Sequence, residues 1–187
     1  HTHQGAAPSH GFKVGIGTLA VTALYEELLD LPLDRLDVES CCAAWPSEDA
    51  WMAFARRTLG DGEVAAAGIK ELRAKHIGVE ALRSQLETLR ATWSVLRTKL
   101  RAQLLPPPVL RGMLCAANAP VDPGQIGIGR ERLRASYWQA FCIRRRFTVL
   151  DLAGRVGVLA QGLDRIFGPG GLWPLYANES KETSEKP

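Results

Sequence analysis

The sequence predicts an all-α fold, a multi-helix bundle of about eight helices, and three observations support this. Apolar residues recur at spacings of three and four residues along most of the chain, which is the period of an α-helix. Prolines and glycines divide the chain into segments of helical length. No segment has the alternating pattern of a strand. With 187 residues, of which 46% are hydrophobic, the chain is long enough for one domain with a sizeable core.

The first predicted helix begins after Ser9, whose hydroxyl is suited to cap it. The helix ends near Leu29 and Asp30, because Pro32 disfavours helical backbone at the residue before it. Its helical spacing is marked by Val14, Thr18, Val21 and Tyr25, and by Leu24 and Leu28.

Three shorter helices are predicted next. Asp37 caps a short helix that runs through Ala44. Ser47 opens a second helix that stops at Gly60, with acidic residues in its first turn that suit the helix dipole. The third covers Glu63 to His76, and we expect His76 to be a residue of the helix end rather than a ligand.

The longest periodic run predicts a helix with a core-facing stripe, and its spacing also resembles a coiled-coil seam. The apolar residues of this run are Val79, Leu82, Leu86, Leu89, Trp93, Leu96 and Leu100. The weakly helical residues 92–94 are a candidate position for a kink or a break into two helices. Pro106 to Pro108 end the run and serve the first turn of the next helix.

Two further helical stretches are predicted after a loop, Arg130 to Arg146 and Thr148 to Phe167. Gly154 and Gly157 are candidate positions at which the second stretch divides into two helices. We expect Leu172 and Trp173 to dock as the last apolar anchor.

The predicted layout of the chain has three parts. Residues 1–9 form a flexible arm, and residues 10–173 form a helical, metal-bearing domain. Residues 174–187 form a polar, disordered tail.

Charge and cysteine content exclude several classes of function. The net charge of +3 is too small to indicate nucleic acid by itself, and no apolar run is long enough to span a bilayer, so neither partner is predicted. We expect the arginines at positions 130, 132, 134 and 144–146 to be surface charges, because no exposed aromatic residues are interleaved with them. One of these arginines is a candidate for contact with a substrate phosphate. The four cysteines form no C-x-x-C pair, which indicates buried free thiols in a reducing cytoplasm.

His10 is the candidate metal ligand of the chain. It lies in the first turn of the opening helix, where the helix dipole favours the neutral imidazole that binds metal. A histidine at a helix start also serves as a solvated or capping residue. Gly11, Gly15 and Gly17 lower the helix propensity of this stretch by roughly 1 kcal/mol each, which indicates that a partner approaches this face closely.

Two other features of this stretch are not treated as sites. Gly15 to Ala20 matches the dinucleotide fingerprint G-x-G-x-x-A, but that fingerprint requires a preceding strand, and this segment is helical. We therefore expect no cofactor-binding residue here. His1 and His3 could join His10 as ligands, but a mobile terminus is the favoured interpretation.

Several segments resemble one dehydrogenase family. The segment His10 to Thr18 resembles the helix of iron-type and glycerol dehydrogenases that carries a His-Gly-x-x-Val metal histidine. Ala117 to Pro120, Ile126 to Arg134 and Ile143 to Leu152 resemble the C-terminal half of sn-glycerol-1-phosphate dehydrogenase. The resemblance runs from His10 to about Trp173.

The resemblance implies the C-terminal helical domain of a two-domain enzyme that interconverts dihydroxyacetone phosphate and sn-glycerol 1-phosphate. It implies that a missing N-terminal domain binds NAD(P), and that a divalent metal, zinc or nickel, polarises the substrate carbonyl. His10 would be one metal ligand, and the remaining ligands and the substrate histidine would precede His1. We therefore expect no catalytic residue in this chain, inactivity in isolation, a small phosphorylated substrate and a possible homo-oligomer.

Two alternatives stay open. A sister dehydrogenase acting on glycerol or a related polyol shares the opening motif. A stand-alone helical interaction module would instead use the stripe from Val79 to Leu100 as a partner surface and would bind no metal. The reading frame upstream of His1 distinguishes these possibilities.

Overall fold

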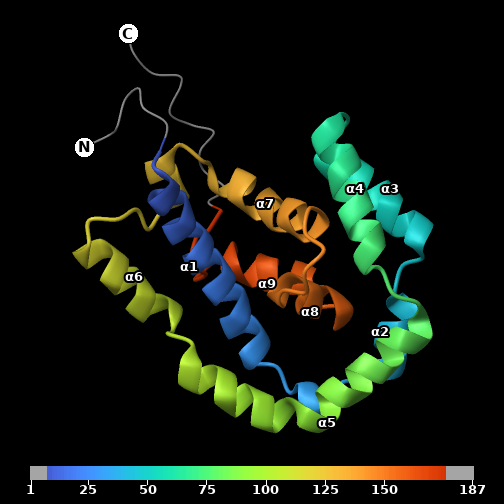
Figure 1. Ribbon diagram of the computed structural model, residues 1–187. Helices are drawn as coiled ribbons and strands as arrows, with labels where there is room; N and C mark the ends of the chain where they lie inside the picture. The colour runs from blue at the N-terminus through green and yellow to red at the C-terminus, as the bar shows by residue number, and fades with distance from the viewer. Residues whose placement is uncertain (1–7, 176–187) are drawn as a thin grey trace.

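The computed structural model describes residues 8–175, which form helices and no strand (Figure 1). The predicted all-α bundle is therefore confirmed. Within the described range, the elements in chain order are α1 (His10–Leu29), η1 (Leu33–Arg35), α2 (Val38–Ala44), α3 (Glu48–Leu59), α4 (Glu63–Lys75), α5 (Val79–Gln103), α6 (Pro107–Ala116), η2 (Pro123–Ile126), α7 (Arg130–Cys142), α8 (Val149–Arg155) and α9 (Leu159–Ile166), where η marks a 3-10 helix.

Helices α1, α2 and α3 each begin after a short polar side chain that caps them. The side chains of Ser9, Asp37 and Ser47 each accept a hydrogen bond from the backbone N–H three residues later, at 3.2, 3.0 and 3.3 Å. Each bond satisfies one of the N–H groups that a helix start leaves without a partner. The predicted caps Ser9 and Asp37 are confirmed, and Ser47, predicted to open its helix, caps it as well.

Helix α5 is continuous where a break was considered. Trp93, at the candidate break, is 1% exposed, and its indole N–H donates to the carbonyl of Leu31 at 3.0 Å. This buried anchor holds the middle of the helix against the chain that follows α1. The apolar stripe of α5 is used inside the fold, because α5 packs on η1 and α2 and buries Leu82 and Leu86. The stripe is therefore covered within the fold at Leu82, Leu86 and Trp93, whereas Val79 at its start is 40% exposed.

Helix α7 ends at Cys142, whereas the sequence predicted a helix to Arg146. The carbonyl of Phe141 would accept a bond from the N–H of Arg145 if the helix continued. Instead it accepts a hydrogen bond from the ammonium of Lys75. A contact with α4 therefore takes the place of the next helical bond.

The last helical stretch divides at Gly157, one of the two predicted positions. Gly157 has a φ of +75°, a left-handed conformation that favours glycine, and it separates α8 from α9. Gly154 stays inside α8, where an added Cβ would lie 3.3 Å from the ring of Phe141. Its role is close packing rather than a helix break.

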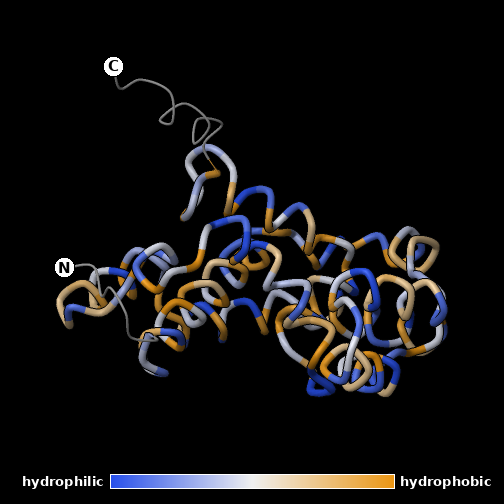
Figure 2. Tube along the Cα trace, turned by 90° about the horizontal axis from the view of Figure 1, so that it is seen from above, coloured by the Kyte–Doolittle hydropathy of each residue, from blue (hydrophilic) through white to orange (hydrophobic). Residues whose placement is uncertain are grey.

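Helix α1 lies in the middle of the molecule and contacts α6, α8, α9 and η2 (Figure 1). The hydroxyl of Tyr137 on α7 donates to the carbonyl of Ala20 at 2.8 Å, in a fully buried position. The hairpin of α3 and α4 packs on α7 at the far side. Hydrophobic and hydrophilic residues alternate along the helices when the molecule is seen from above (Figure 2).

The end of the described chain is tied to the core. Trp173 is 1% exposed, as predicted for the last apolar anchor, and its indole N–H donates to the carbonyl of Val121 at 3.1 Å. The N–H of Leu175 donates to the carbonyl of Phe167 at 2.8 Å. The first two residues of the predicted tail thus bond to the fold, and residues 1–7 and 176–187 lie outside the described residues.

We expect Tyr137→Phe to lower the free energy of unfolding by about 1–2 kcal/mol, because it removes a buried hydrogen bond to the central helix. The matched control is Tyr25→Phe, since Tyr25 is half-buried on α1 and its hydroxyl makes no hydrogen bond within residues 8–175. Urea denaturation followed by circular dichroism measures both. Equal stabilities of the two variants would contradict this assignment.

Candidate functional site

His10 lies exposed in the first turn of α1, directly after the capping Ser9. Val14, Gly17 and Val21 follow it on the same face of the helix, at spacings of four, three and four residues. Val14 and Val21 are 49% and 41% exposed. An added Cβ at Gly17 would meet no atom within 4 Å. The face that begins at His10 is therefore apolar, smooth and open to solvent.

The same face is covered further along the helix. Leu24 and Leu28 continue it at the same spacing, and they are 0% and 1% exposed. Gly162 of α9 packs against Leu24, since an added Cβ there would lie 3.2 Å from the leucine side chain. The C-terminal half of the face thus belongs to the core, while the half that carries His10 is left open by the described part of the chain.

His10 does not belong to a complete set of metal ligands among residues 8–175. No group of three histidine, cysteine, aspartate or glutamate side chains in residues 8–175 is arranged to hold a metal ion. His10 fits the role of one ligand, because its imidazole is exposed at a helix end. The described residues alone do not complete a metal centre, and His1 and His3 lie outside them.

His76 has a structural environment, as expected. Its Nε2 atom lies 3.3 Å from the carbonyl oxygen of Pro46, and its ring stacks on Trp45 with 6.0 Å between ring centroids. The indole N–H of Trp45 in turn donates to the carbonyl of Ile77 at 2.9 Å. These contacts join the end of α4 to the loop before α3.

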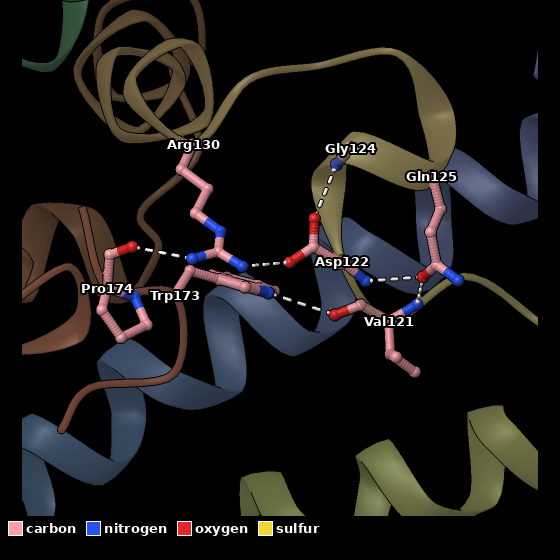
Figure 3. Close-up of polar contacts among 7 residues, drawn as sticks. All are labelled: Val121, Asp122, Gly124, Gln125, Arg130, Trp173 and Pro174. Carbon is pink, nitrogen blue, oxygen red and sulfur yellow. Dashed lines mark hydrogen bonds and ion pairs between the residues drawn. The ribbon is translucent and has the colours of Figure 1, made fainter. Parts of the chain in front are cut away.

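The arginines near the start of α7 are engaged in contacts within the fold. Arg130 pairs with Asp122 at 2.8 Å and also donates to the carbonyl of Pro174 at 2.8 Å (Figure 3). Asp122 additionally accepts from the N–H of Gly124. Arg134 pairs with Asp164 at 2.5 Å.

The arginines after α7 are less engaged. Arg145 pairs with Glu71 of α4 at 3.0 Å. Arg144 and Arg146 are exposed and make no ion pair or side-chain hydrogen bond with any residue from 8 to 175. The structure therefore divides the predicted group of arginines between the two ends of α7 and does not bring them to one site.

A buried ion pair that the sequence did not indicate joins α4 to α8. The ammonium of Lys75 lies 2.7 Å from the carboxylate of Asp151, and the two side chains are 8% and 4% exposed. Lys75 also lies 4.2 Å from the centroid of the Phe141 ring. The other oxygen of Asp151 accepts from the N–H and hydroxyl of Thr148, which forms a capping box at the start of α8. Every polar atom of the pair is directed to the fold, so its role is structural.

A small cavity borders this pair, with room for about one water molecule. Its lining consists of Trp45, Trp51, Leu72, Lys75, His76, Phe141, Asp151 and Arg155. The indole nitrogen of Trp51 is buried and has no hydrogen-bond partner among residues 8–175. A cavity of this size does not admit an organic substrate.

The four cysteines are free, as predicted, but they are not all buried. Cys42 and Cys142 are buried, Cys41 is half-buried and Cys115 is exposed on α6. Burial raises the pKa of Cys142 to about 11, and the nearby Lys75 opposes this shift in part. A thiol that resists ionisation is a poor nucleophile, so Cys142 is a core residue.

Comparison of the chain with known protein families, curated proteins and solved structures finds no match. None of the described helices is both long enough and apolar enough to cross a bilayer. The fold and the site define an all-helical domain with one exposed histidine at the start of its central helix.

We expect Lys75→Met to lower the free energy of unfolding by about 3–5 kcal/mol, because it leaves Asp151 buried without a counter-charge. Adding Asp151→Asn should recover part of this loss, since the amide oxygen still caps α8. The control is Arg73→Met, which breaks an exposed pair with Glu48 and should cost no more than about 1 kcal/mol. Denaturant titration tests this, and a Lys75→Met cost no larger than that of the control would disprove the role of the pair.

Stability should fall as the pH rises from about 9 to 11. In the unfolded chain a cysteine thiol ionises at its ordinary pKa of 9.0, whereas Cys142 in the fold ionises near 11. Between these values the folded state holds the extra proton, so rising pH favours unfolding. Cys142→Ala should make the decline shallower, and Cys115→Ala should leave it unchanged. Identical pH profiles for the wild type and Cys142→Ala would refute this linkage.

Proposed function

We propose that this chain is the helical domain of a metal- and NAD(P)-dependent dehydrogenase that interconverts dihydroxyacetone phosphate and sn-glycerol 1-phosphate, with His10 as one metal ligand. The resemblance of His10 to Thr18 and of the three later segments supplies the family. The observation that supports it most strongly is the open, histidine-bearing half of α1.

The composition of α1 requires a partner for this surface. Only Lys13, Glu26 and Glu27 carry charge among its 20 residues. A helix that is apolar nearly all round belongs in the interior of a protein. Its C-terminal half satisfies this condition, and its N-terminal half does so only if another surface covers Val14 and Val21. A preceding domain that closes over this end would supply that surface.

The lack of a three-residue ligand group within residues 8–175 is compatible with this arrangement. A catalytic metal centre takes about three protein ligands, so the others would come from the preceding domain, as would the residues that bind NAD(P). The bound metal would polarise a carbonyl oxygen of the substrate. The free thiols accord with the reducing cytoplasm that we also propose as its location.

Of the two alternatives, the sister polyol dehydrogenase has the same support from α1. Only its substrate would distinguish it from the proposed enzyme. The interaction module loses its main support, because the stripe of α5 that would bind a partner packs on η1 and α2.

The first experiment is to sequence the reading frame upstream of His1 and to express the complete protein that it encodes. We expect metal-dependent oxidation of NAD(P)H with dihydroxyacetone phosphate, and less activity in the reverse direction with glycerol than with glycerol 1-phosphate. Preference for glycerol would favour the sister enzyme. An encoded protein without a nucleotide-binding domain would exclude both.

In that protein, His10→Ala should lower bound metal and turnover together, each by at least about tenfold. The matched control is His3→Ala, which removes a histidine from the same terminal region and should change neither quantity. Metal content is measured by mass spectrometry of the purified protein. Normal metal content with normal turnover in His10→Ala would show that His10 is not a ligand.

A further inference from the structure

The loop between α7 and α8 carries positive charge that the fold does not neutralise. Arg144 and Arg146 are exposed and have no partner among residues 8–175. The one carboxylate paired with this loop, Glu71, is used by Arg145. Asp151, which follows the loop, is used by the buried Lys75. Two guanidinium groups therefore face solvent without a counter-charge from the described part of the chain.

A third guanidinium group adjoins the loop. Arg155 of α8 lies over the ring of Phe147 at 4.8 Å from its centroid, and its hydrogen-bond partner is the neutral side chain of Gln85. It forms no ion pair in the described part of the chain. Burial lowers the pKa of Arg155, and the nearby carboxylate of Asp151 opposes this shift. The unneutralised charge at this surface therefore comes mainly from Arg144 and Arg146.

Exposed apolar side chains flank the arginines on both sides. Ile143 precedes them and is 40% exposed, and Phe147 follows them and is 59% exposed. Phe147 is thus an exposed aromatic residue directly after the three arginines, although none lies between them. The loop places two apolar side chains and two free cations within five consecutive residues, Ile143 to Phe147.

We propose that the surface formed by Ile143 to Phe147 and Arg155 docks on an anionic lipid surface. Guanidinium groups bind phosphate in bidentate geometry, and apolar side chains beside basic ones enter the boundary between headgroups and acyl chains. A soluble phosphate would use the arginines but would leave the exposed area of Ile143 and Phe147 uncovered. The contact is peripheral and requires no membrane-spanning helix.

This surface is separate from the His10 face. Element η2 contacts both α1 and the start of α7, whereas the loop follows the opposite end of α7 (Figure 1). Docking there leaves the His10 face open, and the inference does not depend on the proposed dehydrogenase activity.

Co-sedimentation of the 187-residue chain with lipid vesicles tests the proposal. We expect binding to vesicles of phosphatidylcholine with phosphatidylglycerol, no binding to phosphatidylcholine alone, and weaker binding as salt rises. Arg144→Gln with Arg146→Gln should weaken binding by at least about tenfold, since each basic residue near such a surface contributes roughly fivefold. Phe147→Ser should also weaken binding, although it leaves every arginine in place.

The matched control is Arg56→Gln with Arg57→Gln. Both residues are exposed at the end of α3, and the change in net charge is the same. Equal weakening by the control pair would overturn the proposal, because net charge alone would then explain binding. Equal binding to neutral vesicles would overturn it as well.

Two further binding experiments test other anionic ligands. Binding of a labelled single-stranded oligonucleotide without binding of anionic vesicles would overturn the proposal in favour of nucleic acid. Binding of inorganic phosphate that depends on Arg144 and Arg146, without vesicle binding and without an effect of Phe147→Ser, would overturn it in favour of a soluble phosphate ligand. Circular dichroism confirms that each variant is folded.

Discussion

The need to cover helix α1 determines the arrangement of the molecule. With three charged residues among 20, α1 cannot present a polar face to water over its whole length. Helices α6, α8 and α9 pack around it, and Tyr137 fixes α7 to its backbone by a buried hydrogen bond. Helices α3 and α4 pack on α7. Helix α5 is joined to the chain that follows α1 by the hydrogen bond from Trp93 to Leu31. The open half of α1 is the part of this arrangement that the described residues leave incomplete.

Local signals made much of the fold predictable. Ser9, Asp37 and Ser47 cap helices through bonds to residues three positions away, so the chemistry lies within one turn. Gly157 ends α8 through its own backbone conformation. The end of α7 was not predictable in this way, because Lys75 binds the Phe141 carbonyl from another helix. Propensity carries no information about such a contact.

In the candidate site, too, local features were predictable from sequence and contacts between distant residues were not. The position of His10 at a helix start follows from its neighbours in sequence, but the exposure of its face depends on which part of α1 the other helices cover. The pair of Lys75 and Asp151 joins residues that are distant in the chain. Thr148 and Asp151 form a capping box, so a sequence search for that pattern could have found the carboxylate. Nothing near Lys75 in the sequence distinguishes it from an exposed lysine.

Unpaired arginines alone would be weak evidence for a binding surface. An exposed ion pair contributes about 0–1 kcal/mol, so a protein gains little by pairing Arg144 or Arg146. The more informative residue is Phe147, because leaving a large aromatic side chain 59% exposed forgoes burial that would favour folding. Arg155 covers one face of this ring, with its guanidinium carbon 4.8 Å from the ring centroid. Exposed aromatic area and unneutralised charge thus coincide in one loop. An anionic lipid surface would neutralise the charge and bury the aromatic ring.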